Sequence, residues 1–397
     1  MRLPTHNPVW LTLIALALGL VLQVSSPKPA SAYSTGTCNL TSCWPSGGYQ
    51  KVRWLTSPVF SIDSMGTEST CSEFSTSSWR NEVNCMVKAW SDVGSATIAP
   101  TTRTDTNGWH LNDSSNDNDI AFAPGSSFDP GVLASAWIQP ICDCYYTTRI
   151  DEADILFNED ISWNVGPVAP NSTNYNFIYG NAFRVVALHE IGHALGLSDS
   201  EYGGSHENSE LATMSGAYPN AGWYRGDHSY HGRFWPHPDD AQGLHWMNPS
   251  SSAGRDLAVS RSKYGSGGQA TDLSPITPNS ICPGQTISIN YTIENRGNET
   301  LSSVGVKFYL STDAWIDPSV DISTASTPLF TLGPYTSATY TSSTTVPSSV
   351  TPGDYYVGVY IDPTDAFTGE ASATWNNGVN LPVSPVGNEL LEVRSCP

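Results

Sequence analysis

The stretch HEIGHALGLSD, residues 189–199, decides more about this chain than any other segment of its length. Its two histidines stand four residues apart, so on a helix His189 and His193 project from one face at adjacent turns. That spacing lets two ring nitrogens bind one zinc ion, each at about 2.0–2.1 Å. Glu190 leans over the same ion, where it can take a proton from a bound water. We therefore predict a zinc-binding helix over about residues 182–195.

The other side chains of this helix indicate that it is buried. They are almost all apolar: Val185, Val186, Ala187, Leu188, Ile191, Ala194 and Leu195. A helix that is apolar nearly all round lies in a core, where two histidines and a glutamate need partners, and a metal ion provides them. Gly196 closes the helix, because glycine readily adopts the positive φ that helix C-termini often require.

The predicted zinc site has two candidates for its third ligand. Asp199 lies six residues after His193, within reach of the same ion from the other side of the turn. His206 lies thirteen residues after His193, at the end of the stretch SEYGGSH. We favour Asp199 on its spacing, and two histidines with one carboxylate are a known ligand set for catalytic zinc.

The string HExxHxxGxxD resembles the metzincin zinc motif HExxHxxGxxH with aspartate as third ligand, a variant that snapalysin-type secreted bacterial proteases share. Further segments resemble the matrixin branch of the metzincins, in the same order along the chain. GVLASA at 131–136 is similar to the edge strand along the substrate, and ADILFNEDISW at 153–163 to the last sheet strand. ELATMSGAYP at 210–219 is similar to the Met-turn, and HPDDAQGLHWM at 237–247 to the closing helix.

The resemblance implies a secreted zinc-dependent endopeptidase that hydrolyses protein or peptide substrates. It implies one catalytic zinc ion that polarises the scissile carbonyl, with the ligands His189, His193 and Asp199. Glu190 then acts as general base and afterwards as general acid. Ser135 stands where matrixins carry a histidine that helps to bind a second, structural zinc, so we expect no such ion.

The same resemblance assigns the walls of the substrate pocket. Met214 is implied as an apolar floor beneath the zinc, with Tyr218 and Pro219 on the wall beside the scissile bond. The edge strand against which the substrate lies comprises Val132, Leu133 and Ala134. A second function class stays open, an exported adhesin or binding protein whose metzincin domain is inactive. The intact histidine pair with Glu190 favours the active enzyme.

The net charge of the chain limits the classes of partner that the protein is expected to bind. The 397 residues carry 17 Lys and Arg against 37 Asp and Glu, a formal net charge of −20. This balance argues against nucleic acid or anionic membranes as partners, since phosphate binding depends on clustered cations. The spare carboxylates suit calcium. In NDSSNDNDI at 112–120, Asp113, Asp117 and Asp119 are candidate Ca²⁺ ligands, and an Asx-rich turn without metal is the alternative.

The chain opens with the pattern of a secretory signal peptide over residues 1–32. The apolar run LTLIALALGLVLQV is followed by the small-x-small pattern Ala30-Ser31-Ala32, which predicts cleavage before Tyr33. An uncleaved anchor is the alternative, but the run is short for a membrane span. No later segment is apolar enough to span, so we expect a secreted, extracellular protein without a transmembrane anchor after cleavage.

Eight cysteines fit such an oxidising compartment, and their even number without a CxxC pair indicates disulfides. Our proposed pairs are Cys71 with Cys85 and Cys282 with Cys396. Cys142 and Cys144, separated by one residue, are expected to reach separate partners.

Changes in composition and in the hydrophobic pattern along the chain divide it into domains. Residues 33–249 mix helical and strand patterns, an α+β domain for which the resemblance implies a mostly parallel twisted sheet with long helices. Residues 250–271 are rich in Ser and Gly and are expected to be a flexible linker. Over 272–397, strands such as TISINYTIEN alternate apolar and polar residues, which predicts an all-β, Ig-like sandwich. The segments TIENRGNETLSSVGVKFYLSTD at 292–313 and YYVGVYIDPTDAFTGE at 355–370, with NN at 376–377, resemble the bacterial CARDB module over about residues 272–386. The resemblance implies either a surface-binding or substrate-binding domain or a spacer.

Overall fold

The computed structural model describes residues 53–63, 79–94, 96–105, 117–130, 132–142, 148–163, 183–197, 213–214, 236–252, 254–260, 262–264, 270–272, 276–313, 316–324, 329–364, 366–367, 370, 377–381, 383 and 390–396. Residues 32–397 form one compact unit. Several predicted features lie outside the described residues: the signal segment 1–32, Cys71, most of 112–120, Asp199, His206, Tyr218 and Pro219.

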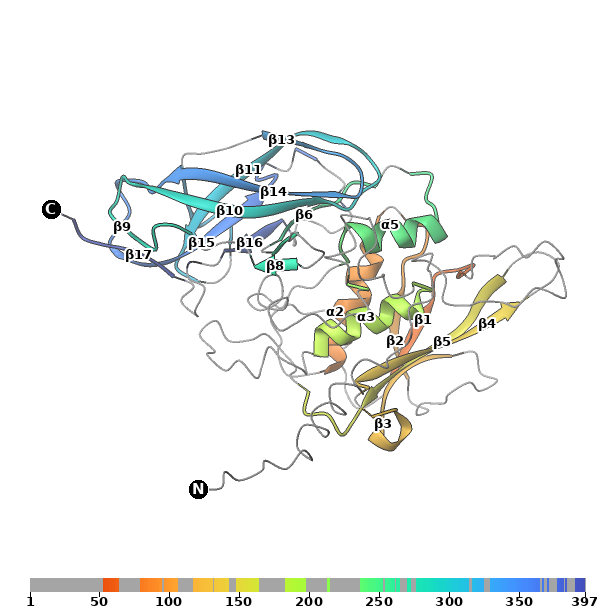
Figure 1. The fold of residues 1–397 in the computed structure, drawn as a ribbon. Coiled ribbons are helices and arrows are strands. Elements are labelled where there is room, and N and C mark those ends of the chain that lie inside the picture. Colours follow the sequence, from red (N-terminus) through yellow and green to blue (C-terminus); the bar gives the residue numbers. More distant parts are fainter. Residues whose placement is uncertain are drawn as a thin grey trace, which may run out of the picture. The chain divides into compact units, whose positions relative to one another are not determined.

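The first half of the chain builds one five-stranded sheet (Figure 1). Its strands are β1 (Val59–Asp63), β2 (Thr101–Asp105), β3 (Asn118–Ala123), β4 (Ala134–Cys142) and β5 (Thr148–Asn158), in the order β2-β1-β3-β5-β4. All neighbours run parallel except β4, which is antiparallel to β5 at the edge. The central strand β3 is buried along almost its whole length, as expected for a parallel sheet covered on both faces. The expected mostly parallel sheet is therefore present.

Three described helices accompany this sheet: α2 (Trp79–Ser91), α3 (Phe183–Ala194) and α5 (Pro238–Met247). They have 13, 12 and 10 residues, which is ordinary for globular proteins. The long helices that we expected do not occur among the described residues. None of the described helices is long and apolar enough to cross a membrane.

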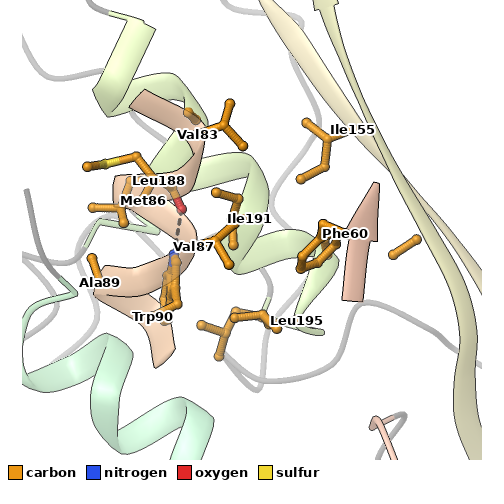
Figure 2. Packing of buried hydrophobic residues seen from close by; sticks show 14 of the residues in the cluster. Phe60, Val83, Met86, Val87, Ala89, Trp90, Ile155, Leu188, Ile191 and Leu195 are labelled. Carbon is orange, nitrogen blue, oxygen red and sulfur yellow. Dashed lines mark hydrogen bonds between the residues drawn. The ribbon is translucent and has the colours of Figure 1, made fainter. Parts of the chain in front are cut away.

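Helix α2 packs on α3 and fixes its position in the core. Figure 2 shows Val87 and Trp90 of α2 facing Ile191 of α3, with Phe60 of β1 beyond them. The indole N–H of Trp90 donates to the Leu188 carbonyl oxygen across 2.8 Å. Trp90 is fully buried, and burial of one large side chain contributes about 1.5–3 kcal/mol to stability. The helix predicted to carry the metal ligands is thus anchored along its length.

The second half of the chain forms a β-sandwich of two main sheets (Figure 1). One sheet has the order β14-β10-β6, made of β14 (Thr336–Thr345), β10 (Thr286–Asn295) and β6 (Leu257–Ser260). The other has the order β12-β11-β15-β17-β9, with β13 beside β11 and β16 beside β15. Its strands are β9 (Ser280–Ile281), β11 (Leu301–Ser311), β12 (Ile322–Ser323), β13 (Leu329–Leu332), β15 (Gly353–Ile361), β16 (Gly378–Asn380) and β17 (Leu390–Val393). A separate pair joins β7 (Ser262–Tyr264) to β8 (Ala270–Asp272). The predicted period-2 strands and the all-β architecture are confirmed.

The expected flexible linker over 250–271 is wrong for part of its length. Leu257–Ser260 forms β6, which pairs antiparallel with β10 and is buried at every residue. The main-chain N–H of Leu257 also donates to the Glu370 carboxylate at 3.1 Å. The reason is that the short run LAVS carries enough apolar surface to complete a sheet, although Ser and Gly around it dominate the local composition.

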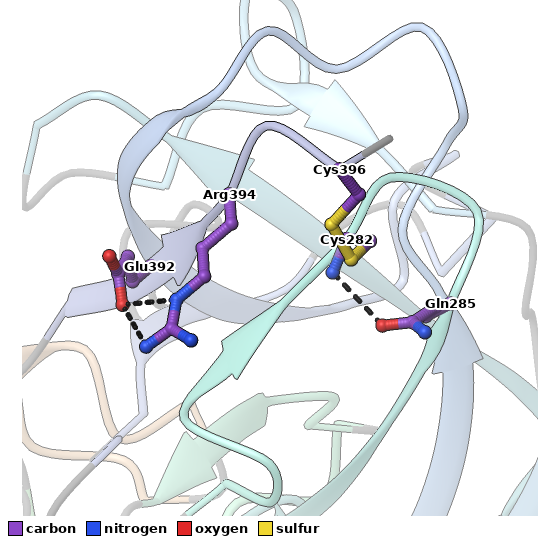
Figure 3. The surroundings of a disulfide bond; sticks show 5 residues. All are labelled: Cys282, Gln285, Glu392, Arg394 and Cys396. Carbon is purple, nitrogen blue, oxygen red and sulfur yellow. Dashed lines mark hydrogen bonds and ion pairs between the residues drawn. A yellow bond between two sulfur atoms is a disulfide. The ribbon is translucent and has the colours of Figure 1, made fainter.

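A disulfide between Cys282 and Cys396 closes the sandwich, as predicted (Figure 3). Cys282 follows β9 and Cys396 follows β17, and these two strands pair in parallel. The bond joins residues 114 apart in sequence, which corresponds to about 5 kcal/mol of stabilisation in the chain-entropy account. Cys85 of α2 is also disulfide-bonded, to a partner outside the residues whose side chains are described.

Candidate metal centre

Helix α3 brings the three motif side chains together. The rings of His189 and His193 lie with centroids 4.6 Å apart and planes at 89° to each other. Both imidazoles are half-buried, whereas Glu190 is only 4 % exposed. A spacing of one helical turn therefore places two ring nitrogens side by side with a buried carboxylate next to them in the chain.

Both histidines are oriented through Nδ1 by backbone carbonyl groups. His189 Nδ1 lies 2.9 Å from the Thr213 oxygen, and His193 Nδ1 lies 2.9 Å from the Leu197 oxygen. A carbonyl oxygen only accepts, so the proton sits on Nδ1 and the lone pair on Nε2. Metal-ligating histidines have this arrangement, with the second ring nitrogen donating to a carbonyl or carboxylate. The residues present therefore fit a metal ion held by two Nε2 atoms.

The end of α3 supplies one of these two carbonyl groups. Gly196 has φ 101°, the left-handed conformation that glycine adopts without strain. The N–H of Gly196 donates to the His193 oxygen at 2.8 Å, and that of Leu197 to the Gly192 oxygen at 3.0 Å. This is a Schellman ending, which turns the chain so that the Leu197 oxygen faces back to His193. The glycine in the motif thus ends the helix and helps to orient the His193 ring.

Met214 packs against α3 at Gly192. It is 2 % exposed, and a Cβ added to Gly192 would lie 2.2 Å from its sulfur atom and 2.8 Å from the Trp90 ring. Only glycine permits this close approach of the Met214 side chain to the helix. The neighbouring Thr213 provides the oxygen that orients His189. The described pair 213–214 therefore contacts the helix that carries His189 and His193.

Asp240 of helix α5 holds this pair in place. Its carboxylate accepts the backbone N–H groups of Thr213 at 2.7 Å, Met214 at 3.1 Å and His237 at 2.9 Å. Burial raises the pKa of Asp240 above its ordinary value, and His237 with the three N–H groups acts in the opposite direction. Sequence reasoning missed this residue. Its signal is an acidic side chain in the first turn of HPDDAQGLHWM, where helices favour carboxylates.

The predicted substrate strand lies at the open edge of the sheet. Val132 and Leu133 precede β4, and Ala134 is its first residue, paired with Phe157. The carbonyl groups of Val132 and Leu133 accept hydrogen bonds from the side-chain and main-chain nitrogens of Asn158. Among the described strands, β4 pairs only with β5, so its other side lacks a strand partner there.

The two candidates for the third metal ligand are not among the residues that the structure describes. Asp199 and His206 both fall outside the described residues, as do the pocket residues Tyr218 and Pro219. Within the described ranges, no group of three or more His, Cys, Asp or Glu side chains is placed to hold a metal ion. The described part of the site therefore comprises His189, Glu190 and His193 with Met214 behind them.

Comparisons with known proteins agree with the division of the chain. Residues 65–219 match the Matrixin family model, Peptidase_M10, and residues 270–380 match the CARDB family model. No curated protein matches the chain. A CARDB domain from Pyrococcus furiosus, solved in complex with di-metal ions, is 16% identical over 34% of this chain and 100% of that chain, with a TM-score of 0.21. A domain of a Methanosarcina acetivorans cell-surface protein is 18% identical over 36% of this chain and 95% of that chain, with a TM-score of 0.21.

A matrixin match supports a metalloprotease, and matrixins generally bind zinc. The CARDB match covers most of the sandwich, including β10, β11 and β15. The chain thus joins a matrixin domain at residues 65–219 to a CARDB domain at residues 270–380.

Proposed function

We propose that the protein is a secreted zinc-dependent endopeptidase, with His189, His193 and Asp199 as zinc ligands. The observation that carries this proposal is the pair of backbone carbonyl groups that orient both Nδ1 atoms, because it presents the two Nε2 lone pairs from adjacent turns of one helix. The matrixin match supports the same chemistry. The disulfides at Cys85 and at Cys282 support an oxidising, extracellular location.

Glu190 is the proposed proton carrier of the reaction. Bound zinc would supply the Lewis acidity that activates a water and the scissile carbonyl. Glu190 takes the proton of the attacking water on its carboxylate and passes it to the leaving amine as the peptide bond breaks. Its near-complete burial keeps bulk water from competing for that proton. The open side of β4 is the proposed place for the substrate, bound as an additional strand through main-chain hydrogen bonds.

Replacement of Glu190 by alanine tests this role. We expect Glu190→Ala to lower kcat on a peptide substrate by about 10²–10⁴-fold while one zinc ion per chain stays bound. Casein cleavage and zinc content are measured together on the wild type and the variant, with Glu159→Ala, an exposed site after β5, as control. Undiminished cleavage by zinc-loaded Glu190→Ala protein would remove Glu190 from the mechanism.

The third ligand is tested separately. We expect Asp199→Ala to lose zinc and His206→Ala to retain it, because the spacing from His193 favours Asp199. Metal analysis of the two purified variants is the measurement. Loss of zinc in the His206 variant alone would assign the ligand to His206.

The alternative is an exported binding protein whose metalloprotease domain is inactive. The CARDB match is the observation that favours it, because this resemblance implies a binding domain or a spacer. A wild-type chain with one bound zinc that leaves casein and a diverse peptide library uncut would establish this alternative. Chelator-sensitive cleavage would exclude it.

A further inference from the structure

Buried charged residues join the sandwich to the N-terminal end of helix α5. Glu294 near the end of β10 accepts from His237 Nδ1, with its two oxygens at 3.0 and 3.2 Å. Arg296, two residues on, donates from Nη1 to the Pro236 oxygen at 3.1 Å and pairs through Nη2 with Asp256 at 2.6 Å. We call Pro236, His237, Asp256, Glu294 and Arg296 the seam. Its charged side chains are at most 4 % exposed.

An apolar contact accompanies these polar ones. Tyr335, between β13 and β14 of the sandwich, is 8 % exposed and belongs to the core cluster that α2, α3 and α5 share. Its ring lies 5.8 Å from that of His245, on the last turn of α5. The N–H of Tyr335 donates to the Gly297 oxygen at 3.1 Å, which ties this contact to the turn that follows Arg296. The sandwich therefore meets α5 at both ends.

A continuous series of hydrogen bonds leads from the seam to the metal centre. Glu294 holds the His237 side chain, and the His237 N–H donates to Asp240. Asp240 in turn accepts the N–H groups of the pair 213–214, whose Thr213 oxygen orients His189. Every link is 3.2 Å or shorter, and Glu294 lies 57 residues beyond His237 in sequence. A residue of the sandwich is thus connected to a proposed zinc ligand through α5.

The burial of the seam distinguishes it from a spacer contact. Interfaces between independently moving domains are usually wet and polar, and charges at their rims contribute little. Here a histidine, two carboxylates and a guanidinium are withdrawn from water, which is tolerated only where each has a partner in a defined geometry. Because breaking such a buried charged pair is strongly destabilising, these pairs favour one arrangement of α5 against the sandwich.

We infer that the CARDB sandwich is a structural brace of the metal centre, with Glu294 as a positioning residue that acts on His189 through His237, Asp240 and Thr213. The inference rests on the proposed function for its catalytic meaning. Its structural part, that Glu294 sets the order of residues 213–214, is independent of any peptidase activity.

The test compares three substitutions in the full-length chain. Glu294→Ala removes the acceptor of His237, whereas Glu294→Gln keeps an oxygen that accepts from Nδ1. Glu299→Ala is the matched control, because it removes a nearby glutamate, in the turn after β10, whose ion pair with Arg255 is only partly buried. For each variant we would measure the zinc dissociation constant by chelator competition, the hydrogen exchange of the Thr213 and Met214 amides, and kcat with KM on a peptide.

For Glu294→Ala we expect the zinc dissociation constant to rise about tenfold and the two amides to exchange at least tenfold faster, with kcat lowered more than KM is raised. Glu294→Gln should restore most of each property, and Glu299→Ala should match the wild type. A folded Glu294→Ala protein with wild-type zinc affinity and amide exchange would overturn the inference. An equal effect of Glu299→Ala would do so as well, since it would show a general loosening of the turn.

The inference remains testable if the Glu294→Ala protein does not fold or if the wild type shows no peptidase activity. If Glu294→Ala does not fold, Tyr335→Ala tests the other end of α5, and faster exchange of the Thr213 and Met214 amides is again expected, while unchanged exchange contradicts the brace. If the wild type binds zinc but cleaves nothing, the proposed function fails, yet the exchange and affinity measurements still decide on Glu294.

Discussion

Gly192 sets how closely Met214 approaches the helix that carries both histidines. The residue occupies the middle of α3, where glycine costs about 1 kcal/mol of helix stability relative to alanine. A Cβ at this position would lie 2.2 Å from the Met214 sulfur and 2.8 Å from the Trp90 ring. The contact between the helix and residues 213–214 therefore outweighs helix propensity at this residue.

Replacement of Gly192 by alanine tests whether this packing contact outweighs helix propensity. Overpacking of a buried site costs about 1–3 kcal/mol, more than the gain in helix propensity. Because Trp90 and Met214 both have to move, we expect Gly192→Ala to lower the free energy of unfolding by about 2 kcal/mol, measured by urea denaturation. Gly305→Ala is the control, since its Cβ would meet its nearest neighbour at 3.8 Å. A Gly192 variant as stable as the wild type would show that Met214 repacks freely.

Among the helices and strands, α5 connects residues 213–214, which contact α3, to the sandwich. Its N-terminal turn holds the pair 213–214 through Asp240, and its flanking residue His237 meets the sandwich. The position of Asp240 in the first turn suits a carboxylate, because it lies at the positive end of the helix dipole. Helix α5 thus holds residues 213–214 in contact with the helix that carries the histidines.

We expect Asp240→Asn to destabilise the protein by about 1.5–3 kcal/mol. The amide keeps one acceptor oxygen and turns an NH₂ group toward a backbone donor, so at least one hydrogen bond to a charged group is lost. Chemical denaturation followed by tryptophan fluorescence measures the change. Asp92→Asn, which removes an i,i+4 pair with exposed Lys88, serves as control and should change stability by less than about 1 kcal/mol. Equal stability of the Asp240 variant and the control would mean that residues 213–214 are held by other contacts.

In the molecule as a whole, Glu370 binds the segment between the two domains at Leu257, the first residue of β6. Its oxygens accept the Leu257 N–H at 3.1 Å and the Asn377 side-chain amide at 2.9 Å. The pKa of Glu370 is raised from 4.5 to about 7, mainly by burial and also by the carboxylates of Asp256 and Asp362, against the lowering effect of the two hydrogen bonds. The attachment of β6 to the sandwich therefore depends on pH.

The pKa of Glu370 is higher in the folded than in the unfolded chain, so the folded state binds its proton more tightly. Its favourable contribution is complete below about pH 4.5 and is lost as pH rises through about 7. The full difference corresponds to at most about 3 kcal/mol. We expect Glu370→Gln to be more stable than the wild type at pH 8, and the advantage to vanish near pH 4.5, in thermal unfolding scans across this range. A constant difference between the two proteins over pH would contradict the raised pKa.

Features that depend on neighbouring residues were predictable from the sequence. The helix over 182–195 corresponds to α3, and Gly196 ends it with a positive φ as expected. The period-2 pattern predicted the strands of the sandwich, and the Cys282–Cys396 pair is confirmed. The helix, its ending and the strands follow from helix spacing, backbone freedom and side-chain alternation, which are properties of a short segment, whereas the disulfide was a guess from the cysteine count.

What only the tertiary structure decided are the contacts between distant segments. These are the pairing of β6 with β10, the contact of Asp240 with Thr213, and the contact of Glu294 with His237, whose partners no local pattern indicates. A buried carboxylate finds its partner by packing and desolvation, which depend on what the rest of the fold brings close. The motif HEIGHALGLSD thus places two imidazoles and a carboxylate on one buried helix, and the surrounding fold determines how firmly the two rings are held.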